Sequence, residues 1–279
     1  MPPEVTAVIT THVRPLHVHE AVASLRAEVH ADVEIVVVDD GGDLGAMGSD
    51  VRIVRGDALG VGRARNLGLA AARGDFVIFL DDDDVALPHR VATLLNAARE
   101  VGAGVCFGRT RRVVVGTSIV LDAVPTHLAS NGFVGFNDIL SCNPHVNAVL
   151  ARTDLLRAVG GFDAEASHFD DWSAWLRLAD RGARIWSVAD VVAEWRMHGS
   201  GLSAQVLHIR AMKARLVALF DRLEGELSPE HARAVADARR VVLSHEIHTY
   251  DDYVHAMATT HADRTGYTPR HAEAGWVLG

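Results

Sequence analysis

The feature of this chain that most constrains its fold is an apolar run that ends in four consecutive acids. Residues 76–80 are continuously apolar, and Asp81, Asp82, Asp83 and Asp84 follow at once. A short uninterrupted apolar run is typical of a strand that is buried on both faces of a parallel sheet. Adjacent carboxylates repel one another, so a buried strand seldom ends in four of them unless a cation offsets the repulsion. The run therefore predicts a central strand with a cation-binding edge.

Other strands and helices alternate with this strand through the first hundred residues. We predict strands at residues 5–10, 34–38 and 51–55, and helices at residues 17–29, 64–72 and 88–99. Their β-α-β-β-α-β-α order is typical of an α/β fold built on a doubly wound, mostly parallel sheet. Gly74 follows the second helix and is expected to end it as a C-terminal cap.

The pattern changes after residue 105, where the sheet is expected to become mixed. We predict a hairpin around Gly116, a returning strand at 147–150, and helices at 154–159, 172–179, 204–223 and from Ser228 to about residue 258. This organisation indicates one catalytic domain followed by a helical C-terminal extension. The apolar side of the extension either packs within the molecule, covers a binding site or forms a homodimer interface.

Composition narrows the partners that the chain is expected to bind. The formal net charge is −9, from 36 acids against 27 bases, which argues against nucleic acid as the main partner but leaves polyphosphate ligands open. The two cysteines, Cys106 and Cys142, are too few for a disulfide scaffold or a cysteine-based zinc site. The first residues lack a basic region followed by an apolar block, and no apolar run approaches the roughly 20 residues of a membrane span. We therefore expect a cytoplasmic protein with no integral membrane segment.

Two further polar clusters follow predicted strands. A Thr-Thr-His sequence at 10–12 follows the first strand, and Asp39 and Asp40 follow the second. Open parallel sheets bind ligands beyond the carboxyl ends of their strands, so these clusters should meet the four acids at one edge. Carboxylates there suit Mg²⁺ or Mn²⁺, which usually take one or two protein carboxylates while a substrate diphosphate completes the shell. The alternative is a solvated loop whose acids cap the helix that begins near Pro88.

A glycine-rich segment with two arginines lies just before the acidic strand. Gly60 and Gly62 precede a predicted helix start, where backbone N–H groups bind anions, and Arg63 and Arg65 suit phosphate. The alternative is that these arginines pair with nearby acids. A dinucleotide-binding fingerprint fits poorly, because the segment lacks the third glycine and follows the third strand.

Taken together, four segments resemble the family 2 glycosyltransferases of the GT-A fold. The segments are VITTHVRP (8–15), VVVDDGG (36–42), GVGRARNLGLAAARGDFVIFLDDDD (60–84) and GGFD…DDW…RLADRG (160–182). The resemblance covers roughly residues 5–203 and implies a Rossmann-like GT-A sheet, a nucleotide-diphosphate sugar donor, Mn²⁺ or Mg²⁺, and an inverting displacement. It also implies a catalytic domain at 1–203, with a nucleotide-binding half at about 1–100 and an acceptor half at about 101–203, before the extension at 204–279.

The resemblance assigns the donor and the metal to particular residues. The positions assigned to the nucleotide are Thr10, His12, Arg14, Asp39, Asp40, Arg65, Asp81 and Asp82. Asp83 corresponds to the metal ligand of the D-x-D element, and His198 to a residue of a glycine-rich closing segment that reaches back to the metal or the diphosphate. A surface loop histidine is the alternative for His198. Family members commonly carry Tyr where His12 stands, so the identity of the nucleobase stays open.

The acceptor side is assigned in the same way. Gly160 and Gly161 resemble the turn that lines the acceptor and donor-sugar pocket, together with Trp172. Asp171 corresponds to the general base that takes the proton of the acceptor hydroxyl, with Asp170 as the fallback. The alternatives are that these acids only stabilise a helix N-terminus, and that the tryptophan packs in the core.

Two other functions remain open at this point. A nucleotidyltransferase also combines an α/β sheet, phosphate-binding Gly and Arg, and acidic metal ligands, but it releases pyrophosphate. A non-catalytic nucleotide-sugar-binding protein would bind the donor without transfer. Because the chain shows no membrane segment, the acceptor of a transferase is expected to be a soluble small molecule or glycan. The alternative is peripheral attachment to a lipid-linked acceptor.

Overall fold

The computed structural model describes residues 3–28, 32–124, 130–166, 168–198, 209–248 and 251–257. The chain divides into two compact units, and each is described by itself. The first comprises Met1–Ile139 and Asn143–Gly201, and the second Leu140–Cys142 and Leu202–Gly279.

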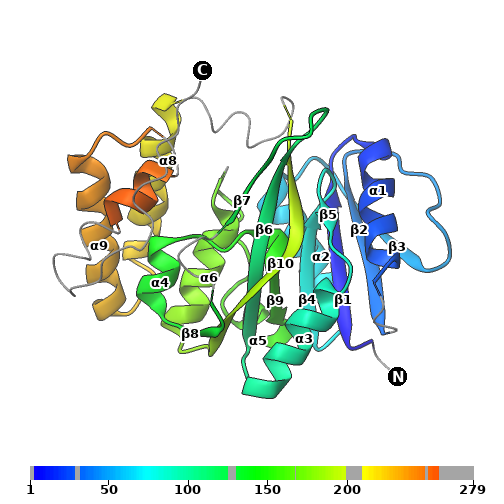
Figure 1. The fold of residues 1–279 in the computed structure, drawn as a ribbon, viewed down its shortest axis with the longest axis horizontal. Coiled ribbons are helices and arrows are strands. Elements are labelled where there is room, and N and C mark those ends of the chain that lie inside the picture. Colours follow the sequence, from blue (N-terminus) through cyan, green and yellow to red (C-terminus); the bar gives the residue numbers. More distant parts are fainter. Residues whose placement is uncertain are drawn as a thin grey trace. The chain divides into compact units, whose positions relative to one another are not determined.

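The described part of the first unit is built on one hydrogen-bonded sheet (Figure 1). Its strands are β1 (Val5–Thr11), β2 (Val33–Asp40), β3 (Val51–Gly56), β4 (Phe76–Asp81), β5 (Val85–Ala86), β6 (Val105–Val114), β7 (Val120–Val124), β8 (Gly132–Val134), β9 (Val149–Arg152) and β10 (Ile185–Met197). The strand order is β3-β2-β1-β4-β9-β6-β10-β5, with β7 on β6 and β8 on β10. Strands β1 to β4 pair in parallel, whereas β9 is antiparallel to both of its neighbours, β4 and β6. The predicted doubly wound, mixed sheet is therefore confirmed.

Helices cover both faces of this sheet, which explains why its central strands are apolar throughout. The helices of the first unit are α1 (Pro15–Arg26), α2 (Val61–Ala71), α3 (Arg90–Val101), α5 (Thr153–Ala158) and α6 (Asp170–Asp180), while α4 (Phe136–Ser141) runs across the boundary between the units. Helices α1 and α3 share a buried core with the β1 residues Val5, Ala7 and Ile9. Helix α2 packs on the opposite face, where Val8 points (Figure 1).

Two glycines allow close approaches that a side chain would prevent. A Cβ on Gly68 of α2 would lie 2.3 Å from Cγ1 of Val8, so this glycine brings the helix down onto β1. The prediction that Gly74 caps α2 is wrong, because the helix ends at Ala71 and Ala72 is already extended. A Cβ on Gly74 would instead lie 2.6 Å from the backbone nitrogen of Thr6. A glycine is needed at position 74 because the backbone there passes too close to the backbone of β1 to leave room for a side chain.

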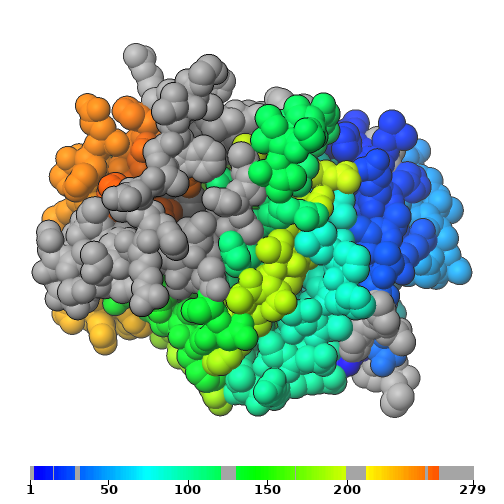
Figure 2. Space-filling model, in the orientation of Figure 1, coloured from blue at the N-terminus to red at the C-terminus, as the bar shows by residue number. Residues whose placement is uncertain are grey.

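Several elements of the sheet and its surroundings were not predicted from the sequence. They are β5, β8, β10 and α4. Strand β10 carries a register shift between Ser187 and Val191, and its residues 189–191 are exposed; Figure 2 shows part of this strand, in yellow-green, at the surface. The predicted hairpin around Gly116 is present, since Val113 of β6 pairs with Val120 of β7.

The second unit is helical in its described part. It contains α8 (Ile209–Glu224), α9 (Pro229–Ser244) and a helical segment at 251–257. The prediction that the helix from Ser228 continues to about residue 258 is wrong, because His245 is extended and ends it. Residues 204–208 of the predicted preceding helix lie outside the described residues. The predicted apolar side packs within this unit, where Leu216, Phe220 and Val242 are fully buried.

The register of the first unit brings the predicted site residues together. Thr10 of β1 is in register with Asp81 of β4, and Thr11 with Asp39 of β2. These parallel strands place their carboxyl ends at one edge, as predicted. In the described parts of the chain, no helix combines the length and the apolar character that crossing a membrane requires.

Candidate active site

The four acids after β4 form a tight turn whose side chains point to different partners. The N–H of Asp84 donates to the carbonyl of Asp81 at 3.1 Å and closes the turn. Thr11 Oγ1 donates to Asp82 Oδ2 at 2.5 Å, and Arg14 Nη1 donates to Asp83 Oδ2 at 2.6 Å. A hydroxyl and a guanidinium thus offset part of the repulsion within the acidic run.

Asp83 and His198 form a pair that suits a divalent cation. His198 Nε2 lies 3.0 Å from Asp83 Oδ2, and the two side chains are 15% and 16% exposed. Neighbouring ligands around an octahedral cation with bonds of about 2.0–2.1 Å lie roughly 3 Å apart, so the separation fits. Within the residues that the structure describes, no group of three or more His, Cys, Asp or Glu side chains is arranged to hold a metal ion by itself. Any cation here would therefore need substrate or water oxygens as further ligands.

Three acids of the turn, Asp81, Asp82 and Asp84, differ in pKa because their surroundings differ. Although burial opposes ionisation of Asp81, the Arg65 guanidinium lowers its pKa. Burial raises the pKa of Asp82 to about 6, and the charge of Asp83 adds to this effect. Burial and the charges of Asp81 and Asp83 raise the pKa of Asp84 well above its usual range. Asp81, Asp82 and Asp84 therefore do not lose their protons over the same pH range.

Arg65 joins the end of β4 to the start of α6. Its Nη1 donates to both carboxylate oxygens of Asp170, at 3.0 and 2.8 Å, and its Nη2 donates to Asp81 Oδ1 at 2.6 Å. The arginine is only 5% exposed. Arg63 likewise pairs with Glu165. The structure therefore realises the alternative of arginines paired with acids, and the Arg65 guanidinium is directed at carboxylates of the chain rather than at a phosphate.

Asp171 stands next to this junction at the N-terminus of α6. Its Oδ1 accepts hydrogen bonds from Asn143 Nδ2 at 3.1 Å and from the N–H of Trp172 at 2.8 Å. Burial, and then the charge of Asp170, raise the pKa of Asp171 to about 7. A carboxyl group with this pKa exchanges a proton near neutral pH, which a general base requires.

The predicted pocket residues divide into two groups. Gly160 and Gly161 have φ angles of +85° and +70°, and a Cβ on Gly161 would lie 2.3 Å from Asn66 Oδ1. Asn66 holds the turn, because it accepts from the N–H of Phe162 at 2.8 Å and donates to the carbonyl of Phe162 at 2.9 Å. Trp172, in contrast, is fully buried and donates its indole N–H to the carbonyl of Ile139 at 2.7 Å. Trp172 therefore packs beneath the site instead of lining it.

The predicted nucleobase residues lie at the same edge, but two of their carboxylates already hold loops. Asp39 accepts from the N–H groups of Gly42 and Leu44, at 3.1 and 3.0 Å, and also pairs with Arg55. Asp40 accepts from the N–H groups of residues 59 and 60, at 2.7 and 3.0 Å. The ring of His12 hydrogen-bonds the carbonyl of Asp40 through Nδ1. These contacts shape the two loops beside β2.

Besides Asn143, three further polar residues of the site were not assigned from the sequence. Asn147 is fully buried and contacts the acidic turn. His145 stacks on Trp195 with ring centroids 5.0 Å apart, and burial lowers its pKa to about 4. Arg90 is fully buried beneath β4 and donates to the carbonyl of Phe79 at 2.8 Å. The only feature of the sequence that marks these three residues is that each is a polar residue within or beside an apolar stretch.

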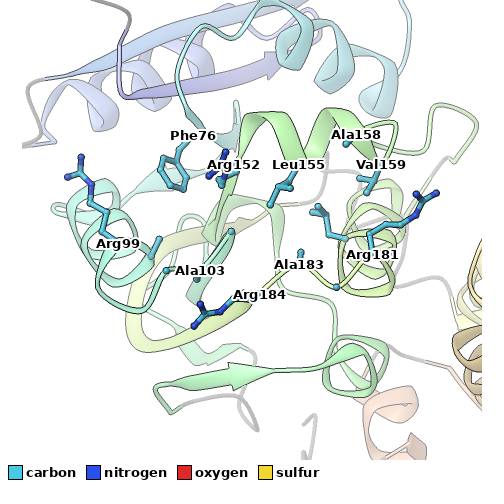
Figure 3. Close-up of a pocket in the computed structure, with 15 residues that line it drawn as sticks. Phe76, Arg99, Ala103, Arg152, Leu155, Ala158, Val159, Arg181, Ala183 and Arg184 are labelled. Atoms are coloured by element: carbon cyan, nitrogen blue, oxygen red, sulfur yellow. The ribbon is translucent and has the colours of Figure 1, made fainter.

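A cavity of about 650 Å³ lies at the opposite, amino-terminal edge of the sheet (Figure 3). Four arginines surround its apolar floor, namely Arg99, Arg152, Arg181 and Arg184. Arg99 pairs with Glu4, Arg152 with Asp154, and Arg184 donates to the carbonyl of Val101 at the end of α3. Arg184 thereby offsets the partial negative charge of the C-terminus of α3. The cavity contains none of the acids of the candidate site.

Comparison with known proteins gives a family and a fold. Residues 6–153 match the model of glycosyl transferase family 2. The chain is 32% identical over 103 residues to "Uncharacterized glycosyltransferase alr2836" of Nostoc sp., which covers 33% of this chain and 32% of the relative. It is 27% identical over 197 residues to "Pre-mycofactocin glycosyltransferase" of Mycobacterium tuberculosis, covering 65% of this chain and 40% of the relative. The matches thus span between about a third and two fifths of these relatives.

Two solved structures share the fold. S. aureus TarS 1-349 in complex with UDP-GlcNAc has a TM-score of 0.66 at 17% identity, over 86% of this chain and 72% of that chain. The mannosyltransferase PcManGT of Pyrobaculum calidifontis, in complex with GDP-Man and Mn²⁺, has a TM-score of 0.65 at 18% identity, over 96% and 77% of the two chains. At these identities the likeness concerns the fold, and it agrees with the sheet described above.

Proposed function

Since this chain belongs to glycosyl transferase family 2 and has the GT-A fold, we propose that it moves a sugar from a nucleoside-diphosphate donor to a hydroxyl group of a soluble acceptor. The transfer is a single displacement that inverts the anomeric carbon and needs Mn²⁺ or Mg²⁺. The first unit carries the chemistry. Donors with UDP or GDP are the first candidates, because the two solved structures that share the fold are complexes with UDP-GlcNAc and GDP-Man.

The observation that carries this proposal is the junction at Arg65. One buried guanidinium pairs with Asp81 of the acidic turn and with Asp170, which adjoins the candidate base. The pairing fixes the start of α6 to the end of β4. A group that accepts a proton and a group that binds a diphosphate–metal complex are thereby held at one edge of the sheet.

Asp171 acts as the general base. Its carboxylate takes the proton of the acceptor hydroxyl as the acceptor oxygen forms a bond to the anomeric carbon. The bond from that carbon to the phosphate oxygen breaks, and the nucleoside diphosphate leaves with the electron pair. Asn143 orients the carboxylate through its hydrogen bond to Oδ1. Asp170 cannot easily take the same role, because Arg65 binds both of its oxygens.

Asp83 and His198 would hold the divalent cation, which neutralises charge on the diphosphate when it is bound. Arg14 lies against Asp83 and binds the diphosphate end of the nucleotide. Thr10, His12, Asp39 and Asp40 surround the nucleoside, with Asp81 or Asp82 at the ribose.

Product analysis tests the proposal. The protein is incubated with UDP-GlcNAc or GDP-mannose, an acceptor panel, and either Mn²⁺ or EDTA. We expect a nucleoside diphosphate and a product of inverted anomeric configuration, with Mn²⁺ only. Release of pyrophosphate from a nucleoside triphosphate would indicate a nucleotidyltransferase instead. Donor binding with neither transfer nor slow donor hydrolysis would indicate a binding protein.

A further inference from the structure

The fourth acid of the turn, Asp84, is engaged differently from the other three. It is 2% exposed. Its Oδ1 accepts from the backbone N–H of Arg196 at 2.6 Å, and its Oδ2 accepts from Nδ2 of Asn147. Both oxygens therefore bind donors from distant parts of the chain, which a free metal ligand would not do.

Asn147 holds the other end of the same turn. Its Oδ1 accepts from the N–H of Asp81 at 2.9 Å, while its Nδ2 donates to Asp84. The side chain is fully buried. One amide thus clamps the first and the last residue of the acidic turn and fixes the loop that carries Asp83.

The bond to Arg196 ties this loop to the end of β10. Strand β5 follows Asp84 and pairs with β10 through Val85 and Glu194. The Asp84 carboxylate continues that ladder by one more bond, with a side-chain oxygen in the place of a backbone carbonyl. Asp83 is one residue from Asp84, and His198 is two residues from Arg196, so this bond joins the two segments that carry the candidate metal ligands.

We propose that Asp84 and Asn147 are positioning residues that set the separation of Asp83 and His198 and so determine the affinity for the divalent cation. This inference rests on the proposed function. It differs from a role of Asp84 as a ligand, because it requires only the hydrogen bonds of residue 84 and not its charge at that position.

An exchange of the two side chains tests this directly. In Asp84→Asn, the new amide N–H₂ faces either Asn147 Nδ2 or the N–H of Arg196, so two donors meet. In Asn147→Asp, two buried carboxylates meet. The double variant D84N/N147D restores all three hydrogen bonds, with one of them reversed, and keeps the net charge. The variants are titrated with Mn²⁺ in the presence of UDP, and separately of GDP, while free Mn²⁺ is followed by EPR.

We expect each single variant to bind Mn²⁺ at least tenfold more weakly, and the double variant to bind within about threefold of the wild type. If the single variants bind like the wild type, or if a folded double variant stays tenfold weaker, the inference is overturned. Should a single variant fail to fold, the double variant decides alone by the same thresholds. Melting temperatures separate lost folding from lost affinity.

Asp83→Ala distinguishes this inference from the function on which it rests. If D83A binds Mn²⁺ like the wild type, the metal assignment of the proposed function fails. If D83A loses binding while D84N retains it, the positioning role alone is wrong.

Discussion

At the scale of single residues, the candidate site depends on what burial does to carboxyl groups. Asp170 and Asp171 are adjacent and nearly equally buried, yet Arg65 binds both oxygens of the first and neither oxygen of the second. Burial therefore raises the pKa of Asp171 to about 7 without a paired cation to oppose it fully. The two acids look alike in the sequence but have different chemistry in the structure.

Asp171→Asn should retain donor binding and lose about 10²–10⁴-fold in turnover, because the amide cannot accept the proton. In the wild type, kcat/KM should rise with pH to a plateau above about 7, as Asp171 ionises. Asp154→Asn is the matched control, since Asp154 also lies in the first turn of a helix but is exposed. Equal losses in both variants would mean that the acids only stabilise helix N-termini.

The same residue predicts how stability depends on pH. Folded Asp171 keeps its proton up to about pH 7, whereas an unfolded Asp loses it near about 3.9. Between these values the folded state binds more protons, so the free energy of unfolding should fall as pH rises from 4 to 7. D171N should flatten this slope. The difference in free energy of unfolding between D171N and the wild type should shift in favour of D171N by on the order of 2–4 kcal/mol between pH 4 and pH 7.5. Urea unfolding at both pH values measures it, and parallel profiles for the two proteins would contradict it.

At the scale of elements, the apolar periodicity of the sequence predicts those strands and helices whose position depends on local packing. Strands β1 to β4 and helices α1 to α3 were predicted because their apolar runs reflect burial on one or both faces. Strand β10 was missed because a register shift and three exposed residues interrupt its pattern. The contact of Arg65 with Asp170 spans 105 residues, and no local pattern encodes it. Periodicity and motifs therefore single out the acids and arginines of the candidate site, but they do not reveal the contacts between those residues.

The turn at Gly160 and Gly161 offers a matched pair of variants. Both glycines have positive φ, but a Cβ on Gly160 meets no atom within 4 Å, whereas one on Gly161 would lie 2.3 Å from Asn66 Oδ1. Gly160→Ala should cost about 1 kcal/mol from backbone strain alone. Gly161→Ala should cost about 1–3 kcal/mol more, because it also displaces the Asn66 hydrogen bonds. Chemical unfolding compares them, and equal losses would show that Asn66 does not hold the turn.

At the scale of the whole molecule, the net charge of −9 disfavours the binding of anions. An anionic ligand can therefore bind only where local cations offset this charge. Arginines of the first unit mostly face carboxylates or helix C-termini, including Arg99, Arg152 and Arg184 at the cavity in Figure 3. Among the described residues of the site, a dianionic diphosphate would therefore meet carboxylates and arginines that already pair with them. Binding of the nucleotide should depend strongly on the divalent cation.

A thermal-shift comparison follows from this balance. UDP or GDP at 100 times its Kd should stabilise the protein by about 2.7 kcal/mol when Mn²⁺ is present. The same nucleotide with EDTA should give a much smaller rise in Tm. Asp83→Ala should reduce the Mn²⁺-dependent part, and an equal rise with and without metal would contradict the dependence.

The Arg65 junction has a consequence for how such a sequence can drift. A planar fork that reaches two carboxylates in different directions has no substitute among the other amino acids, since lysine brings one point charge. A change at this position would loosen the fold and misplace the base in the same event. Selection for stability and selection for catalytic turnover therefore both act on this one position. The surrounding loops are less constrained and can change as the enzyme adapts to other acceptors.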